Sequence, residues 1–346
     1  MKHAFIALAT LIFGVGAVAH AGADSAPSGP LAALLSARQW LNTQPLRAED
    51  LRGKVVLVNF WTYTCINSLR ALPYVREWAK KYRDRGLVVI GVQTPEFSFE
   101  KDAANVSTAL VSLGVDYPIA IDNDYGIWRV FDNDAWPAFY FIGADGQVRH
   151  HVLGEGGYDD SERLIQQLLS EADRTPVADP IVAIEGTGPQ AAADENDLRS
   201  EETYIGYAQA RNFVSPGGAD EYAPSRYRVA SMLSLDSWSL AGAWTIGSEF
   251  AALNEAPGGI SYRFHARDLH LVLAAPSPEH PIRFRIKIDG APPGADHGVD
   301  ADAEGWGSVR EDRMYQLVRQ QRPVADRTFE IEFFDAGVRA YVFTFG

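Results

Sequence analysis

KVVLVNFWTYTCINSLRALPYVREWA, residues 54–79, is the stretch that decides the fold. Residues 55–61 form a short apolar run after Gly53, which is typical of a strand buried on both faces in a parallel sheet. From Leu69 the apolar residues recur at helical spacing, with basic residues over the rest of the surface. The only cysteine of the 346-residue chain, Cys65, therefore lies between a buried strand and the first turn of a helix.

Cys65 is a candidate nucleophile because of this position. Unpaired backbone N–H groups and the positive end of the helix dipole favour an anion, so we expect a thiolate to form more easily than in a free cysteine. The alternative is an inert buried cysteine, since free cysteine is among the most buried residue types. Ser68 stands where a Cys-x-x-Cys pair has its second sulfur, and a hydroxyl cannot resolve a mixed disulfide. The sequence thus contains half of a dithiol site.

The segment 59–73 resembles the redox-active segment of periplasmic thioredoxin-like proteins of the TlpA and DipZ kind. In that group Trp-Thr-Tyr-Thr-Cys-Ile-Asn-Cys-Leu-Arg is a characteristic form. The matching motif residues around Cys65 are Trp61, Thr64, Ile66 and Asn67, and the departure is Ser68. The resemblance implies a thioredoxin-like domain in which Cys65 is the attacking residue.

The same resemblance implies roles for residues outside this segment. Trp136-Pro137 matches the cis-proline that faces the catalytic cysteine in thioredoxin folds, and an ordinary trans proline that opens a strand is the alternative. Asn59 replaces the buried aspartate of thioredoxin, and Ala71 replaces a glutamate of several TlpA-like reductases. Glu155, in a Gly-rich turn that would border the active-site groove, is the acid we expect to compensate. A plain surface turn is the other interpretation of Glu155.

The N-terminus predicts export. Residues 4–18 form an apolar core between a basic start and the small-x-small signal Ala19-His20-Ala21, so we expect a secretory signal peptide over residues 1–21. No other stretch is apolar and long enough to span a membrane, so the protein is expected to be soluble in the periplasm or another exported space. One cysteine allows no internal disulfide, and a net charge of −14 argues against nucleic-acid binding.

The rest of the pattern predicts two domains. A lead-in over residues 22–50, with a helix around 32–41, precedes a thioredoxin-like α/β domain over 51–172, where strands alternate with helices. Residues 173–200 are rich in Pro, Gly, Ala and acidic residues, which is typical of a linker. Short alternating segments over 201–346 predict an all-β sandwich of jelly-roll type. The second domain of DipZ-like proteins resembles carbohydrate-binding modules in fold.

Aromatic residues of the β domain are candidates for a carbohydrate-stacking platform, although such residues are more often part of a sandwich core. They are Trp238, Trp244, Tyr262, Trp306 and Tyr315. Docking of the redox domain or its client is the other use we consider. No cofactor and no metal are predicted, because the acidic loop 296–304 and the two Asp-Asn-Asp runs match no strict ligand spacing.

The sequence therefore predicts an exported thioredoxin-like thiol-disulfide oxidoreductase with Cys65 as its single nucleophile. Its partners would be a thiol or disulfide client protein, held in a groove near Trp136, Pro137 and Glu155, and an external thiol reductant that releases the mixed disulfide. A redox-inactive scaffold that binds clients or carbohydrate is one alternative. A one-cysteine peroxidase is another, although no peroxidase threonine and arginine signature surrounds Cys65.

Overall fold

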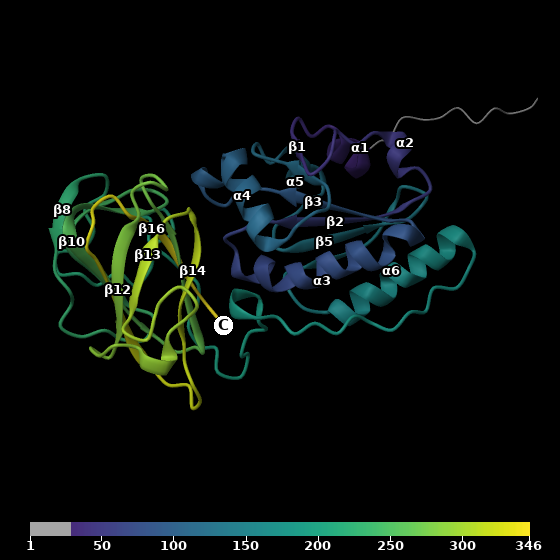
Figure 1. Ribbon diagram of the computed structural model, residues 1–346. Helices are drawn as coiled ribbons and strands as arrows, with labels where there is room; N and C mark the ends of the chain where they lie inside the picture. Colours follow the sequence, from purple (N-terminus) through teal and green to yellow (C-terminus); the bar gives the residue numbers. More distant parts are fainter. Residues whose placement is uncertain (1–28) are drawn as a thin grey trace, which may run out of the picture.

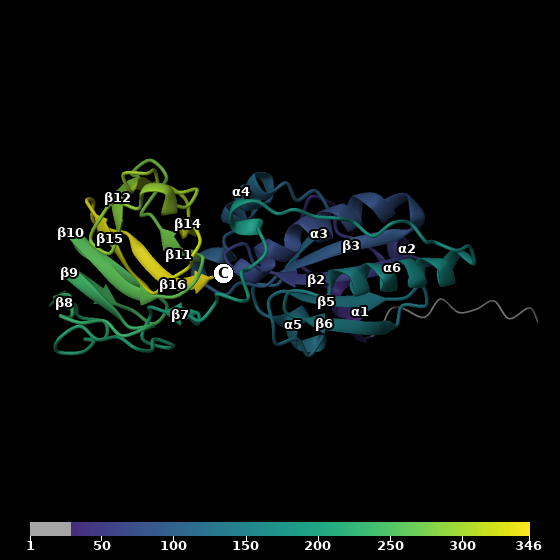
Figure 2. The ribbon, with the colours of Figure 1, turned by 90° about the horizontal axis from the view of Figure 1, so that it is seen from below.

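Two domains lie side by side in the computed structural model, which describes residues 29–346 (Figure 1). The predicted signal peptide, residues 1–21, falls outside the described residues. The first domain is a thioredoxin-like α/β domain, and the second is an all-β domain. The C-terminus lies at the boundary between them in both ribbon views (Figure 2).

The α/β domain is built on a six-stranded sheet with the order β1-β4-β3-β2-β5-β6. Its central strand β2 (Val55–Trp61) is buried at every position, as the apolar run predicts. This strand pairs in parallel with β3 (Leu87–Gln93) and antiparallel with β5 (Ala138–Ile142). The remaining strands are β1 (Trp40–Leu41), β4 (Ile119–Ile121) and β6 (Val148–Leu153).

Helices cover both faces of this sheet because alternate strand residues point to opposite sides. One apolar cluster joins the odd-numbered residues of β2 to α3 (Ile66–Tyr82), α4 (Ala103–Leu113) and α6 (Tyr158–Asp173). A second cluster joins its even-numbered residues to α1 (Gly29–Leu35), α2 (Ala48–Leu51) and α5 (Gly126–Val130).

The lead-in differs from the sequence prediction. The helix expected around residues 32–41 ends at Leu35, and Trp40 and Leu41 instead form β1. They pair with β4 at the edge of the sheet, where Trp40 is buried in the core. Tertiary pairing thus overrides the local helical pattern.

The β domain is one antiparallel ten-stranded sheet that curls into a half-barrel or sandwich. The long strand β10 pairs with β16 near its start and with β15 over its second half, which folds the sheet over its own core. The strands are β7 (Thr203–Tyr204), β8 (Pro224–Tyr227), β9 (Trp238–Ile246), β10 (Ala251–Phe264), β11 (Asp268–Ala274), β12 (Ile282–Ile288), β13 (Trp306–Val309), β14 (Arg313–Arg319), β15 (Arg327–Phe333) and β16 (Arg339–Phe345).

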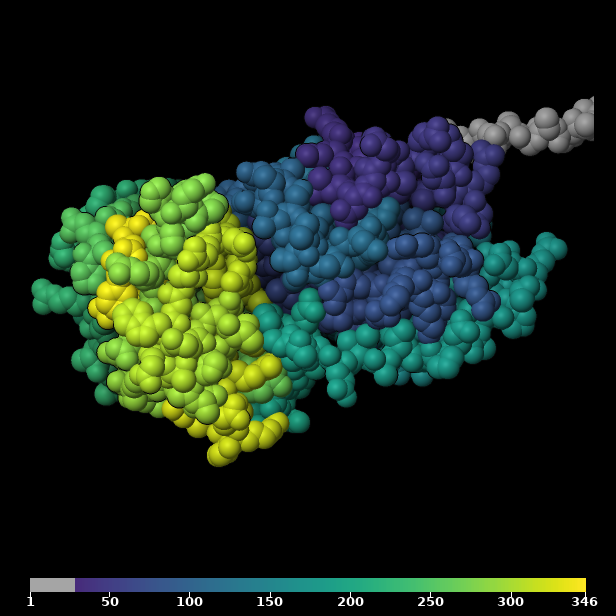
Figure 3. Space-filling view, in the orientation of Figure 1, coloured from purple at the N-terminus to yellow at the C-terminus, as the bar shows by residue number. Residues whose placement is uncertain are grey.

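The two domains are packed against each other, and the space-filling view shows them in direct contact (Figure 3). The apolar core under α3 continues into the β domain through Val272, Met314 and Tyr341. Residues 173–200, predicted as a linker, run along the α/β domain: Val177 is buried, and the Val182 N–H donates to a carboxyl oxygen of Glu162 at 2.8 Å. The second domain is therefore held beside the first by packing as well as by the chain.

Candidate active site

Cys65 is the N-cap residue of α3, so the helix begins at Ile66 rather than at the predicted Leu69. Its carbonyl accepts the N–H of Leu69 at 3.0 Å, which is the first bond of the helix. The Cys65 side chain is half-buried, and its sulfur donates to the carbonyl oxygen of Trp136 at 3.6 Å. The Trp136–Pro137 peptide bond is cis. The structure thus places the cysteine opposite the dipeptide that the family resemblance singled out.

The ionisation of Cys65 contradicts the expectation drawn from the helix N-terminus. The pKa of its thiol is raised to about 12, first because burial disfavours a charged sulfur and second because Glu96 carries a nearby negative charge. The backbone N–H and the hydroxyl of Ser68 act in the opposite direction. That hydroxyl has no hydrogen-bond partner among residues 29–346 in this state, so it is available to bind a thiolate. Cys65 is accordingly a neutral thiol near pH 7.

Glu100 fixes the turn that precedes Cys65. Its carboxylate is fully buried and accepts the hydroxyls of Thr62 and Thr64 and the backbone N–H groups of Glu96 and Phe97, at distances between 2.5 and 3.0 Å. Four donors on one carboxylate join the end of β2 to the loop after β3. Sequence reasoning missed this residue, because nothing in its local pattern distinguishes it from other acids of the loop.

The remaining motif residues form the surroundings of the sulfur. Trp61 and Ile66 are buried in the core, whereas Asn67 is half-buried beside Cys65. Cys65 and Asn67 are the partly exposed positions of residues 61–70, so reagents reach the motif at these two residues. The other residues of this segment are buried by packing.

Glu155 lies in the Gly-rich turn after β6, next to the active-site helix. Its carboxylate forms an ion pair with the buried Arg70 of α3 at 3.1 Å. Burial raises the pKa of Glu155 and the Arg70 charge lowers it. Arg70 also donates to the carbonyl oxygen of Phe345 at 3.0 Å, next to the C-terminus. The pair therefore attaches the end of the β domain to the active-site helix.

The β domain borders the site directly. The Tyr204 hydroxyl, on β7, donates to the carboxyl of Glu96, which also acts on the Cys65 thiol. Next along the loop, Phe97 and Phe99 pack on Tyr341 with ring centroids 5.0 and 4.9 Å apart. The loop after β3 thus takes part both in the active site and in the contact between the two domains.

Comparison with known proteins supports this architecture. Residues 31–151 match the AhpC/TSA family model, and residues 200–346 match the model described as a thioredoxin-like C-terminal domain. The two matches fall on the two domains of the structure.

Its relatives include DipZ and thiol-disulfide oxidoreductases. Protein DipZ of Mycobacterium tuberculosis is 39% identical over 240 residues, which cover 68% of this chain and 33% of DipZ. The chain thus spans about a third of the length of the DipZ proteins. Thiol-disulfide oxidoreductase YkuV of Bacillus subtilis is 28% identical over 144 residues, which cover 42% of this chain and 97% of YkuV. A solved thioredoxin-like protein in the oxidised form is 30% identical, with a TM-score of 0.36, over 39% of this chain and 90% of that protein.

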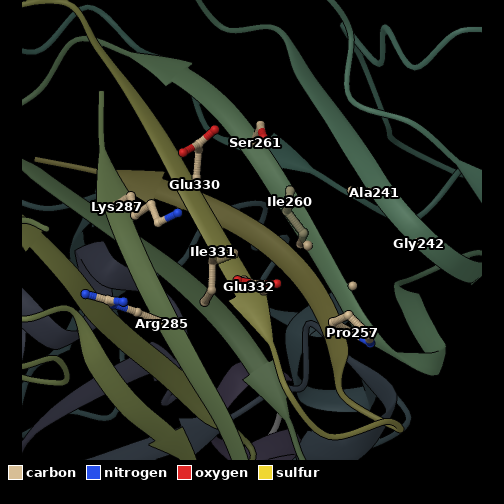
Figure 4. Close-up of a pocket in the computed structure, with 12 residues that line it drawn as sticks. Ala241, Gly242, Pro257, Ile260, Ser261, Arg285, Lys287, Glu330, Ile331 and Glu332 are labelled. Atoms are coloured by element: carbon tan, nitrogen blue, oxygen red, sulfur yellow. The ribbon is translucent and has the colours of Figure 1, made fainter. Parts of the chain in front are cut away.

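The aromatic residues considered for a stacking platform in the C-terminal domain belong, with one exception, to the core of the sandwich. Trp238, Trp244 and Tyr262 are fully buried and Tyr315 nearly so, because their positions face the core of the curled sheet. Trp306 is the exposed ring of the set, at 44%. A groove of about 290 Å³ does lie on this domain, but it contains no aromatic ring (Figure 4). Its charged lining residues are Arg285, Lys287, Glu330 and Glu332.

A larger cavity, of about 800 Å³, lies at the domain boundary behind the motif. Tyr63 and Leu69 line it from the active-site segment, and residues 310–314 line it from the C-terminal domain. The Tyr63 hydroxyl is buried and has no hydrogen-bond partner in the described part of the chain. Cys65 does not line this cavity.

Two further features of the described residues bear on the predicted partners. Within residues 29–346, no group of three or more His, Cys, Asp or Glu side chains is arranged to hold a metal ion. In the predicted acidic loop, Asp300 instead pairs with Arg313 at 2.7 Å. Over the same residues, no helix has the length and apolar character needed to cross a membrane.

Proposed function

We propose that this protein is a thiol-disulfide oxidoreductase in which Cys65 forms a mixed disulfide with a client protein and an external thiol releases that client. The observation that carries the proposal is the position of Cys65 at the N-cap of α3, half-buried and facing the Trp136–Pro137 cis peptide. Ser68 offers a hydroxyl and an N–H to a thiolate at Cys65 but no second thiol. The reaction therefore stops at the mixed disulfide until another thiol arrives.

Two relatives support a redox function. YkuV and the thiol-disulfide oxidoreductase ResA of Bacillus thuringiensis carry that activity in their names, and ResA is 27% identical over 128 residues. The contact between the Cys65 sulfur and the Trp136 carbonyl supports the same function. A client strand that binds along Pro137 brings its own sulfur to the Sγ atom of Cys65. The expected client is thus a protein with an accessible cysteine or disulfide.

Export is part of the proposal. The basic start, the apolar core and the Ala-His-Ala signal over residues 1–21 support secretion into an oxidising compartment, where disulfide-bonded clients are found.

Mass spectrometry under non-reducing conditions tests the mechanism. The protein lacking residues 1–21 is incubated with a disulfide-containing model client such as insulin, and the Cys65 adduct is quantified. We expect a mixed disulfide that persists until glutathione is added, none in Cys65→Ser, and release without added thiol in Ser68→Cys. A wild-type protein that forms no adduct with any disulfide client contradicts the proposal.

A redox-inactive scaffold is the second candidate, because the neutral, half-buried thiol and the close domain packing favour binding over chemistry. Cys65→Ala separates the two functions: client binding that survives this substitution supports the scaffold. Rapid peroxide consumption that depends on Cys65 would instead indicate a one-cysteine peroxidase.

A further inference from the structure

The cavity at the domain boundary is lined by a tyrosine whose hydroxyl is not used. Tyr63 lies two residues before Cys65, and its side chain is 3% exposed. Its hydroxyl has no hydrogen-bond partner among residues 29–346. Burial, and then the negative charges of Glu100 and Asp312, raise the pKa of Tyr63, so this hydroxyl stays protonated and can donate. Because an unpaired buried donor is unfavourable, the cavity wall contains a donor that lacks an acceptor.

The acids that line the cavity already have cationic partners. Two acids and four arginines are among its lining residues. The carboxylate of Asp312 lies 3.8 Å from the guanidinium of Arg339. The carboxylate of Glu311 lies 3.7 Å from the guanidinium of Arg313. The other two arginines therefore face the cavity without a lining carboxylate to neutralise them.

These two arginines, Arg76 and Arg310, come from different domains. Arg76 lies on α3 and donates to neutral acceptors, the carbonyl oxygen of Leu113 and, at 3.4 Å, the side-chain oxygen of Gln190. Arg310 lies in the turn between β13 and β14 and is exposed. Within the part of the chain that the structure describes, neither guanidinium forms an ion pair with a carboxylate. A guanidinium group has the geometry to bind a carboxylate or a phosphate through two N–H groups.

The rest of the lining is largely apolar. Leu69 is seven residues before Arg76, so both lie on one face of α3, and Met314 faces them from the C-terminal domain. A volume of about 800 Å³ is within the range of small-molecule sites, which combine an apolar wall with a few polar groups. The exposed Arg310 and Pro276 show that the cavity is open to solvent. The lining thus fits a molecule that has an apolar body and an anionic head.

We propose that this cavity binds a small organic anion, with its carboxylate or phosphate head held by Arg76 and Arg310. The apolar body of the ligand lies against Leu69 and Met314, and the Tyr63 hydroxyl donates to a ligand oxygen. The anion supplies the missing counter-charge in a chain whose net charge is otherwise −14. It also contacts both domains at once, so its binding stabilises their contact.

The bound anion acts on the segment that holds the cysteine. Tyr63 and Leu69 lie on either side of Cys65 in the sequence, and the Leu69 N–H donates to the Cys65 carbonyl at 3.0 Å. Cys65 itself does not line the cavity, so the ligand leaves the sulfur free. Binding of the anion is therefore independent of the proposed disulfide exchange, although it changes how the sulfur reacts.

Isothermal titration calorimetry of the protein lacking residues 1–21 tests the site with three probes. They are 1-naphthyl phosphate, 2-naphthoate and the neutral naphthalene-2-methanol. We expect at least one anion to bind once per chain, with a dissociation constant of about 1 mM or below, as ligands of this size do in ordinary sites. The neutral probe should bind about tenfold more weakly or less. The tighter of the two anions shows whether the natural head is a phosphate or a carboxylate.

Two substitutions and two matched controls locate the binding. Arg310→Gln should weaken the anion about tenfold, and Tyr63→Phe about fivefold. Arg228→Gln changes an exposed arginine of the same domain outside the cavity, and should bind as the wild type does. Tyr117→Phe removes another buried, unpartnered hydroxyl that does not line the cavity, and should also leave binding unchanged. Tyr63→Phe removes a hydroxyl without a partner, so we expect this variant to fold.

The proposal is overturned if neither anion binds, if the neutral probe binds as tightly, or if Arg310→Gln binds as tightly as its control. An unchanged affinity in Tyr63→Phe contradicts the contact with the active-site segment. Saturating anion should change the rate of Cys65 alkylation by iodoacetamide about twofold or more, and an unchanged rate contradicts the effect on the sulfur. Cys65→Ser should bind the anion as the wild type does. A protein that binds the anion but forms no mixed disulfide contradicts the proposed function alone.

Discussion

Substitutions of Glu100 should destabilise the active-site loop, and Glu100→Ala should do so more than Glu100→Gln. Glu100→Ala leaves the buried N–H of Phe97 and the part-buried N–H of Glu96 without an acceptor, and each unsatisfied group costs about 1–3 kcal/mol. The hydroxyls of Thr62 and Thr64 can rotate toward other acceptors, so we expect a loss of about 2–6 kcal/mol. Glu100→Gln keeps an oxygen for the two N–H groups and turns its amide N–H toward the hydroxyls, so only the charge assistance is lost, about 1 kcal/mol.

Urea unfolding, followed by far-UV circular dichroism, measures these losses, and the alkylation rate of Cys65 reports on the loop itself. Glu279→Ala, at an exposed position of the β domain, is the control and should stay within about 0.5 kcal/mol of the wild type. Two results would refute the reasoning: Glu100→Ala that is no less stable than the control, or Glu100→Gln that is as unstable as Glu100→Ala.

Other predictions follow from buried charges and from the N-terminus. Burial lowers the pKa of His270 from 6.5 to about 4. The free energy of unfolding should therefore be unaffected by this group above pH 6.5 and fall by about 3 kcal/mol as the pH drops to 4. Urea titrations at each pH should show that His270→Gln lacks this part of the pH dependence. Arg70→Met removes the contacts to Glu155 and Phe345, and should lower stability by about 1–3 kcal/mol and speed carboxypeptidase trimming of the C-terminus. Expression in a bacterium with intact secretion should yield a periplasmic protein that begins at Gly22, and an N-terminus at Met1 would refute this cleavage.

Local pattern predicts much of the fold because strand and helix periodicities are properties of short segments. The apolar run of β2 and the apolar face of α3 place Cys65 at a helix N-terminus before any contact is known. Glu100 and Tyr204 could not be predicted in this way, because each contacts residues that are far away in the sequence. Trp238 and Trp244 show a related limit in the β domain: the sequence left both a stacking platform and the sandwich core open for them, and the curled sheet places them in the core.

The ionisation of Cys65 shows why a local argument can give the wrong sign. A helix N-terminus stabilises an anion by at most about 2 kcal/mol, even in favourable, partly buried geometries. A pKa of about 12 in place of 9.0 corresponds to about 4 kcal/mol against the thiolate, so burial and Glu96 outweigh the helix. The Glu96 carboxyl accepts a hydrogen bond from Tyr204 on the C-terminal domain, so the electrostatic effect on Cys65 depends in part on residues that the motif does not contain. The reactivity of this cysteine is therefore a property of the two packed domains, and the motif alone cannot specify it.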